Sequence, residues 1–344
     1  MRDTMPRWTD GVVLFDKPLG ISSQKAVTIV KHACLANKAG HTGTLDPLAT
    51  GLLAVCLGEA TKYSQDLFNA DKTYITKIHF GVKTETGDAE GKIIDQRTYD
   101  GDTSPEAFLA SLEKISPSFM GAIQQVPPMY SAIKKDGRPL YAYAREGEMF
   151  DLAAREVHIR YLKWRSVDFP YAELEVSCSK GTYIRSLVSD MGELLGCGAH
   201  LTALRRTQIG HLKIEDAQIE EEIKVAPNLM AVDSLITHLP AIILNQEVAL
   251  RFKMGQRVAA KDIELPNSSE ISTGEETATN IFKIYHLENG PEMFMGIVEL
   301  KNGVLHPKRL MATDRLEYLL GLGDSGQFLG TDISIRHHLT KPIH

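Results

Sequence analysis

Apolar and polar residues follow two periods along most of the chain, one typical of strands and one of helices. The segments GVVLFDKP (11–18) and LLAVCLG (52–58) are almost continuously apolar, which predicts buried strands. Between them the pattern predicts a helix that begins at Ser22 or Ser23, with a serine as N-cap, and ends near Leu35. Further strands are expected at KTYITKIHFGVKT, REVHIRYLKW and AELEVSCS, and further helices over 104–115 and from about Tyr183 to Leu195.

These strands and helices follow no regular βαβ order, which predicts an α+β fold with a mixed, largely antiparallel sheet. Near Pro240 the pattern changes to short alternating segments separated by Gly, Asn and Pro turns, typical of a small β-barrel of about seventy residues. The expected strands there lie in AIILNQEVALRFKMGQRV, NIFKIYHL, EMFMGIVEL and GVLHPKRLM. The predicted division is therefore a domain over 1–238, a barrel over 239–312 and a tail over 313–344.

The tail contains two segments with candidate chemistry, GLGDSG and RHHLTKPIH. The first lacks the Gly-Lys-Ser/Thr of a phosphate-binding loop. The histidines of the second are more typical of a solvated tail than of a metal site.

The composition is that of a globular protein and argues against a membrane protein, a secreted protein and a zinc- or disulfide-stabilised fold. The 344 residues are 43% apolar and 24% charged, as in ordinary globular proteins, and no apolar run reaches membrane-spanning length. The N-terminal segment MRDTMPRWTD lacks the apolar stretch of a signal peptide. The four cysteines are far apart without a C-x-x-C pair, so neither a zinc site nor a disulfide framework is expected. We expect a cytoplasmic protein without a bound metal.

Positive charge is concentrated locally although the net charge is −6. From Lys17 to Leu45 the chain carries four lysines and no acidic residue, and from Cys178 to Lys213 five Lys/Arg face only two acidic residues. Both stretches are rich in Gly, Thr or Tyr. Because nucleic-acid recognition depends on local patches and not on net charge, these stretches are candidate RNA-binding surfaces.

The first basic stretch ends at Asp46, in the loop GHTGTLDPLATG (40–51). Asp followed by Pro is a common helix start, with Asp as N-cap and Pro at the first helical position. Gly51 follows within five residues, however, so such a helix has room for about one turn. The glycines and threonines before Leu45 suit a backbone that lies close to a bulky ligand. Asp46 could cap such a turn and still present its carboxylate to a ligand.

The loop and its flanks resemble the TruB family of tRNA pseudouridine synthases. Order and spacing agree with the family from residue 11 to 212, and HPKRLM with the small barrel resembles the PUA domain at the C-terminus of many members. The segments that carry the resemblance are FDKPLGISS, GHTGTLDPLATGLLAVCLGEATK, DKTYITKIHFGVKTETGD, QVPPMYSAIKKDGRPLYAYAREG, KGTYIRSLVSDMGELLG and AHLTALRRTQIG.

The resemblance implies isomerisation of uridine to its C-glycoside, a reaction without redox change or group transfer, so no cofactor is expected. It assigns the catalytic carboxylate to Asp46, as nucleophile at C1′ or as base at C2′, and both routes stay open. Arg185 is the matching cation, which would keep that carboxylate ionised when the site closes. Tyr74 matches the tyrosine that stacks on the target uracil and whose hydroxyl helps to remove the C5 proton.

Three further positions carry over from the resemblance. Tyr183 is expected near Arg185, lining the pocket. Leu204 matches an apolar floor residue, and core packing is an equal explanation for it. His41 matches a flat side chain that fills the stack vacated by an extruded base, which offsets part of the cost of base flipping. A role for His41 as proton shuttle fits less well, because Asp and Tyr already supply the chemistry.

The expected partner is tRNA, bound through its T-arm, elbow and acceptor end, with the uridine at position 55 of the T-loop as target. The segment from about 124 to 154 resembles a mobile thumb that closes over the RNA arm, although EGEMFDLAAREV at its end is acidic for such a role. The barrel would raise RNA affinity without touching the chemistry. No membrane and no obligate protein partner are expected.

Three rival functions are compatible with parts of the sequence. A guide-dependent relative, such as the catalytic subunit of the box H/ACA particle, shares the Asp loop, but the thumb-like insertion favours a stand-alone enzyme. A pure RNA-binding or RNA-folding protein does not need Asp46, Tyr74 and Arg185 together. A hydrolase using His41 and Asp46 lacks a Ser or Cys nucleophile in a suitable turn.

Overall fold

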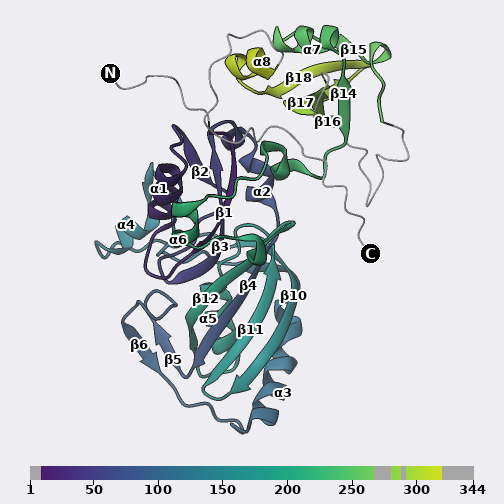
Figure 1. Cartoon of the computed structure of the whole chain (residues 1–344). Coiled ribbons are helices and arrows are strands. Elements are labelled where there is room, and N and C mark those ends of the chain that lie inside the picture. The colour runs from purple at the N-terminus through teal and green to yellow at the C-terminus, as the bar shows by residue number, and fades with distance from the viewer. Residues whose placement is uncertain (1–8, 267–279, 288–291, 320–344) are drawn as a thin grey trace, which may run out of the picture.

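The computed structural model describes residues 9–266, 280–287 and 292–319. A nine-stranded sheet, the main sheet, has the order β1-β3-β12-β4-β11-β10-β7, with β2 beside β3 and β13 beside β12 (Figure 1). Only β3 and β12 pair in parallel among the described strands of this sheet. The strands are β1 (Gly11–Lys17), β2 (Ala39–His41), β3 (Ala49–Leu57), β4 (Lys72–Phe80), β7 (Gly121–Gln125), β10 (Arg155–Asp168), β11 (Tyr171–Cys178), β12 (Ala199–Ile209) and β13 (Leu212–Lys213).

This arrangement confirms the predicted α+β class with a mixed, largely antiparallel sheet. The continuous apolar runs of β1 and β3 arise because both faces of these strands are covered. Val13 and Phe15 belong to the core beneath α1 (Ser23–Ala33), whereas Val12 and Leu14 belong to a second core on the opposite face. Alternation along a strand is lost from the sequence when both of its faces are buried.

Helix α1 confirms the predicted N-cap. The Ser22 side chain accepts a hydrogen bond from the backbone N–H of Lys25 at 3.1 Å, and the helix buries an apolar stripe that includes Val27 and Val30. It ends two residues before Leu35, which has a φ of 51°. The other helices of the first 238 residues are α2 (Ser64–Asn69), α3 (Pro105–Ile115), α4 (Leu140–Ala144), α5 (Ile184–Leu194) and α6 (Glu220–Val225). Of these, α3 and α5 pack on one face of the main sheet.

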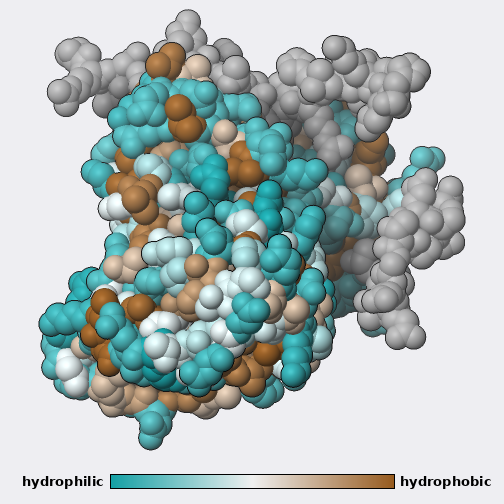
Figure 2. Space-filling model, turned by 90° about the horizontal axis from the view of Figure 1, so that it is seen from below, coloured by the Kyte–Doolittle hydropathy of each residue, from teal (hydrophilic) through white to brown (hydrophobic). Residues whose placement is uncertain are grey.

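Two small hairpins extend from the main sheet. One is formed by β5 (Val82–Thr84) and β6 (Ile93–Gln96), and the other, in the predicted thumb, by β8 (Lys134–Lys135) and β9 (Arg138–Pro139). Figure 2 shows the molecule from below, with hydrophobic residues in small separate groups among hydrophilic ones, as on ordinary protein surfaces. Among the described residues, no helix has both the length and the apolar character that a membrane span requires.

The second sheet lies in the C-terminal part of the chain and has the order β14-β16-β17-β18-β15. Its members are β14 (Ala241–Leu244), β15 (Val258–Ala259), β16 (Ile281–His286), β17 (Met293–Lys301) and β18 (Val304–Leu310), followed by α8 (Thr313–Leu319). The domain boundaries and the PUA-like character of this part stay predictions. The segments GLGDSG and RHHLTKPIH lie outside the described residues.

One predicted strand segment is wrong: residues 246–253 form a helix, α7 (Gln246–Lys253). The Asn245 side chain accepts a hydrogen bond from the Val248 backbone N–H at 3.0 Å and so caps the helix. Val248, Ala249 and Phe252 then face the core together, which is helical spacing.

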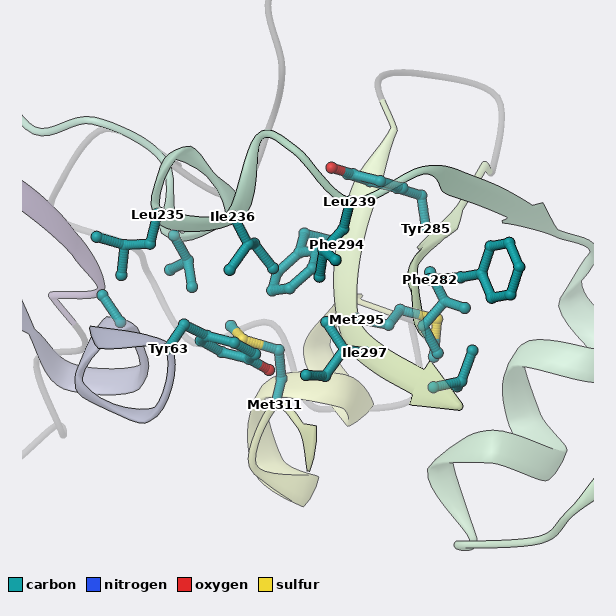
Figure 3. Packing of buried hydrophobic residues seen from close by; sticks show 14 of the residues in the cluster. Tyr63, Leu235, Ile236, Leu239, Phe282, Tyr285, Phe294, Met295, Ile297 and Met311 are labelled. Carbon is teal, nitrogen blue, oxygen red and sulfur yellow. The ribbon is translucent and has the colours of Figure 1, made fainter. Parts of the chain in front are cut away.

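A continuous hydrophobic core joins the second sheet to the part of the chain before residue 239 (Figure 3). Tyr63, after β3, lies edge-on to Phe294 of β17 with ring centroids 5.3 Å apart, and its hydroxyl donates to the Arg309 carbonyl at 3.1 Å. Leu235 and Ile236 point into the same cluster from the segment before β14. The two parts therefore do not have separate cores.

Candidate active site

Asp46 lies in the loop between β2 and β3, where β3 begins its parallel pairing with β12. No helix follows Asp46. Its carbonyl accepts from the Ala49 backbone N–H at 3.1 Å, closing a single turn, and β3 begins at Ala49. The capping interpretation is therefore wrong, because the strand starts before a helix can form.

The residues on both sides of Asp46 are fixed by the segment that precedes and opens α1. Ser23 Oγ donates to the Leu45 carbonyl at 2.9 Å and accepts from the Leu45 N–H at 2.7 Å. The Pro47 carbonyl accepts from the Gly20 N–H at 2.9 Å and lies 3.5 Å from Lys17 Nζ. Asp46 is thus held in place by its neighbours' backbones, which leaves its carboxylate free to make other contacts.

Arg185, at the start of α5, forms an ion pair with that carboxylate, with 3.0 Å between its Nη2 and Asp46 Oδ2. The arginine side chain is 6% exposed and the aspartate side chain 40%. The carboxylate therefore faces a buried cation on one side and is accessible on the other. The structure therefore brings together Asp46 and Arg185, as the sequence predicts. A closed site is expected from the sequence, whereas the Asp46 side chain is partly exposed.

Main-chain carbonyls from two other segments hold the Arg185 guanidinium. Nη1 donates to the Thr86 carbonyl at 3.0 Å, and Nη2 donates to the Tyr130 carbonyl at 2.8 Å. The buried Asp88 carboxylate lies 3.7 Å from Nε. Sequence reasoning missed Asp88 as a site residue, although the segment that carries it, ETGD, ends one of the blocks quoted for the resemblance.

Tyr74 lies on β4 in direct register with Arg206 on β12. Burial raises the pKa of Tyr74, and the nearby Arg206 guanidinium opposes part of that rise. Arg206 is 1% exposed and donates to the carbonyls of Leu52 at 2.8 Å and Gly43 at 3.1 Å. It therefore lies under the loop that carries Asp46, whereas the sequence indicates only a basic surface patch.

His41 ends β2, directly before the loop that carries Asp46. Its Nδ1 accepts from the Gly43 backbone N–H at 3.2 Å, so this nitrogen carries no proton in the observed geometry. Burial lowers the pKa of His41, and the positive charge of Arg206 lowers it further. The imidazole is therefore a neutral, flat ring near the mouth of the loop.

Tyr183 lies two residues before Arg185, and Leu204 packs in the core next to the Asp46 loop. Tyr183 caps α5 two positions before Arg185, and the buried Gln125 side chain bonds both its N–H (2.8 Å) and its carbonyl (3.1 Å). Leu204 pairs in register with Ala49 and Thr76 and belongs to the same hydrophobic cluster as Leu45. Leu204 is 9% exposed, so it packs in the core at the edge of the site.

Three buried cations around the site are bonded to main-chain carbonyls. Lys17 and Lys72 have their pKa lowered by burial to about 8, and Arg206 completes the set. The carbonyl acceptors are those of Pro18, Ile21 and Pro47 for Lys17, of Leu67, Phe68 and Ala70 for Lys72, and of Leu52 and Gly43 for Arg206. From the sequence, Lys17 and Arg206 belong to the two basic stretches that are candidate RNA-binding surfaces, and Lys72 has no assigned role.

The arrangement offers one accessible carboxylate, a buried guanidinium that binds it, and a protonated phenol from the adjacent strand. Such a set can supply a nucleophile or a base together with a proton relay. Within the described ranges, no group of three or more His, Cys, Asp or Glu side chains has the arrangement of a metal site.

Comparison with known proteins identifies matches along most of the chain. Residues 31–184 match the TruB family pseudouridylate synthase N-terminal domain, 185–251 the tRNA pseudouridylate synthase B C-terminal domain, and 240–311 the Pseudouridine synthase II TruB C-terminal region. The chain is 46% identical to tRNA pseudouridine synthase B of Cupriavidus metallidurans, covering 88% of this chain and 94% of that protein. It is 45% identical to tRNA pseudouridine synthase B of Burkholderia lata, covering 89% and 92%.

Two solved structures share the fold. A chain of a Cbf5-Nop10-Gar1 complex is 25% identical with a TM-score of 0.62, covering 89% of this chain and 86% of that one. A chain of an archaeal box H/ACA sRNP Nop10-Cbf5 complex is 22% identical with a TM-score of 0.62, covering 91% and 94%. The second likeness shows the fold alone.

Proposed function

The chain belongs to the TruB family of pseudouridine synthases, and on that premise we propose that it isomerises uridine 55 in the T-loop of tRNA without a guide RNA. It is an enzyme, a tRNA pseudouridine synthase, and no other class of activity is needed to explain its site. The observation that carries the proposal is the pair of Asp46 and Arg185, with a 3.0 Å contact and a carboxylate open to a ligand.

The reaction moves one bond and one proton. The N1–C1′ bond breaks, the uracil turns over, C5 bonds to C1′, and the proton on C5 leaves for N1 through the site and solvent. Asp46 attacks C1′ or removes the C2′ proton, and the geometry is compatible with both. Arg185 fixes one oxygen of the carboxylate, so that the other oxygen points toward the substrate.

Tyr74 stacks on the uracil and relays the C5 proton. Its pKa is raised by burial, so the phenol is protonated at neutral pH. A protonated phenol takes up the C5 proton only while it gives up its own. Arg206, in register beside it, stabilises the negative charge that develops on the phenol oxygen in that exchange.

His41 fills the gap that the extruded base leaves in the T-loop, because a neutral aromatic ring stacks without a charge to desolvate. Tyr183 and Leu204 form the wall and the floor of the pocket beside Arg185 and the catalytic loop. The shuttle role for His41 is disfavoured by its Nδ1, which already accepts the Gly43 N–H.

The proposed RNA-binding parts are the thumb over 124–154, which closes on the T-arm and elbow, and the C-terminal sheet, which takes the acceptor end. In the thumb, Lys135 lies 3.6 Å from the centre of the Phe150 ring, and Arg138 pairs with Glu146. These internal partners reduce the charge that the thumb offers to phosphates. We propose no obligate protein partner, and a cytoplasmic location remains a prediction from the sequence.

The test is incubation of an unmodified tRNA transcript with this protein alone, followed by carbodiimide primer extension. A single stop at position 55 is expected, and Asp46→Asn serves as the inactive control. A requirement for added guide RNA or protein would instead place the chain with guide-dependent enzymes. Tight binding and tRNA refolding, without any modification, would favour the RNA-folding alternative.

A further inference from the structure

We propose that the hydrogen bond between Tyr130 and Glu85 is a latch that positions Arg185 against Asp46. The latch joins the thumb to the loop between β5 and β6, and neither residue contacts Asp46. The inference deepens the proposed function and rests on it. Tyr130 and Glu85 are therefore positioning residues, which act on the reaction through the Arg185 guanidinium.

The contact itself links two segments that are distant in the sequence. Tyr130 Oη donates to Glu85 Oε1 at 2.6 Å, and Glu85 is exposed while Tyr130 is half-buried. A hydrogen bond to an ionised carboxylate is stronger than one between neutral groups. The bond thus holds the thumb base at a defined distance from the β5–β6 loop.

The latch closes a ring that contains Arg185. The guanidinium donates to the carbonyls of Thr86 and Tyr130, at 3.0 and 2.8 Å. Thr86 follows Glu85 directly, and Tyr130 is itself the latch residue. Both carbonyls that hold the arginine are therefore tied together by the side-chain bond next to them.

The same nitrogen connects this ring to the catalytic carboxylate. Arg185 Nη2 bonds the Tyr130 carbonyl at 2.8 Å and Asp46 Oδ2 at 3.0 Å. A shift of residue 130 therefore moves the Nη2 proton that Asp46 accepts. Misplacement of about 1 Å in a catalytic group lowers rates strongly, so a modest loosening is sufficient to slow the reaction.

One side of the ring is rigid and the other depends on the latch. The Thr86 hydroxyl bonds the buried Asp88 carboxylate, and Thr84 Oγ1 donates to the Asp88 carbonyl at 2.6 Å. On the thumb side, the next contacts toward the body come from Gln125 and from Val126, whose carbonyl accepts from Ser186 Oγ at 3.2 Å. Met129 and Tyr130 pack in the thumb's own small core, so the latch and Arg185 tie this thumb unit to the β5–β6 loop.

The experiment compares Tyr130→Phe with wild type in single-turnover assays at saturating tRNA and in a direct binding assay. We expect the chemical rate to fall about three- to tenfold, the range for losing one exposed hydrogen bond of ordinary net strength, with tRNA affinity within about twofold. The matched control is Tyr161→Phe, which removes a 2.8 Å bond from Tyr161 Oη to Glu175 Oε1 on the exposed face of the sheet. That control should keep the wild-type rate.

Two further variants separate positioning from a general structural effect. Glu85→Gln keeps an acceptor oxygen and should recover most of the rate, whereas Glu85→Ala should match Tyr130→Phe. The Tyr130→Phe, Glu85→Ala double variant should be no slower than either single variant. In the Arg185→Lys background, Tyr130→Phe should add nothing, because lysine cannot bond both carbonyls and the carboxylate in one plane.

Four results would overturn the latch: an unchanged chemical rate in Tyr130→Phe, a loss confined to affinity, additive losses in the double variant, or an equal loss in Tyr161→Phe. Failure of the proposed function itself gives a different pattern. In that case the wild-type chain makes no pseudouridine in tRNA, and no variant comparison is possible.

Discussion

Removal of residues 239–344 should destabilise the catalytic part, and not only weaken RNA binding as the sequence alone predicts. The shared core is the reason. Tyr63, Leu235 and Ile236 are at most 1% exposed and pack in one cluster with Phe294, Met295 and Met311. Truncation after residue 238 removes the second half of this cluster.

The size of the effect follows from the three side chains that lose their partners. Full exposure of a large apolar side chain costs about 1.5–3 kcal/mol, so the three contribute up to about 5–9 kcal/mol. Domains are stable by about 5–15 kcal/mol in total. For a chain of this size, each kcal/mol lowers the melting temperature by about 2–4 °C. We therefore expect a fall of about 10 °C or more, or aggregation.

Polar contacts across the same boundary add to the loss. Glu59 Oε2 accepts from the Ala312 backbone N–H at 2.6 Å, and Arg315 Nε lies 2.5 Å from Asp10 Oδ2. Truncation leaves Glu59 and Asp10, both acidic, without these partners. Water replaces part of these hydrogen bonds, so the exposure of apolar side chains accounts for most of the expected loss of stability.

The assay is thermal unfolding by circular dichroism of the full and the truncated chain, with single-turnover rates below the melting point. Phe294→Ala in the full chain is the companion variant, expected to cost about 3–5 kcal/mol. With a shared core, this substitution should lower the temperature at which activity is lost and the temperature at which secondary structure is lost by the same amount. The reasoning is refuted if the truncated chain melts within a few degrees of the full one and keeps its saturated chemical rate.

The other predictions concern the site. Asp46→Asn should abolish isomerisation while tRNA binding stays within about tenfold, because the amide keeps the shape but neither attacks nor accepts a proton; near-normal turnover would exclude Asp46 as the catalytic group. Arg185→Lys should lose most activity in the same assay, since lysine keeps the charge but not the planar fork. Tyr74→Ala should lose most turnover with the stacking, and the single-turnover rate of Tyr74→Phe measures what the hydroxyl adds. Lys17, with its pKa lowered by burial from 10.5 to about 8, should lose its proton as the pH rises through about 8. Turnover should then fall above that pH, and the pH–rate profile of Lys17→Met should lack this limb. The unfolded chain binds more protons than the folded one between about pH 8 and 10.5, so this lysine's contribution to the free energy of unfolding rises with pH across that window.

Local signals predicted the parts of the fold that short-range chemistry decides. The Ser22 cap and the apolar spacing of α1 lie within a few residues of each other, and the structure has that helix. The same kind of signal was present at Asn245, but strand-like alternation around it led to the wrong prediction for α7. A short amphipathic segment can fit both the helical and the strand spacing of apolar residues, and only packing against the surrounding core decides between helix and strand.

The site was predicted where the family resemblance supplied its residues, as for the pairing of Arg185 with Asp46. It was not predictable where side chains meet main-chain carbonyls. The acceptors of Arg206 are the carbonyls of Leu52 and Gly43, and any residue type offers a carbonyl. The sequence therefore contains no signal for these contacts. From sequence alone, a buried arginine bound to carbonyls cannot be distinguished from a surface arginine.

The carbonyl-bonded cations also shape how the protein meets a polyanion. Lys17, Lys72 and Arg206 have their donors satisfied by neutral dipoles, so their charges are not cancelled as they would be by carboxylates. The chain as a whole is negative, with a net charge of −6. A phosphate chain is thus repelled at long range, where salt weakens the force, and attracted only within about a Debye length, roughly 8 Å. The enzyme should bind nucleic acid poorly by charge alone, and favour molecules whose shape lets a backbone reach the pocket.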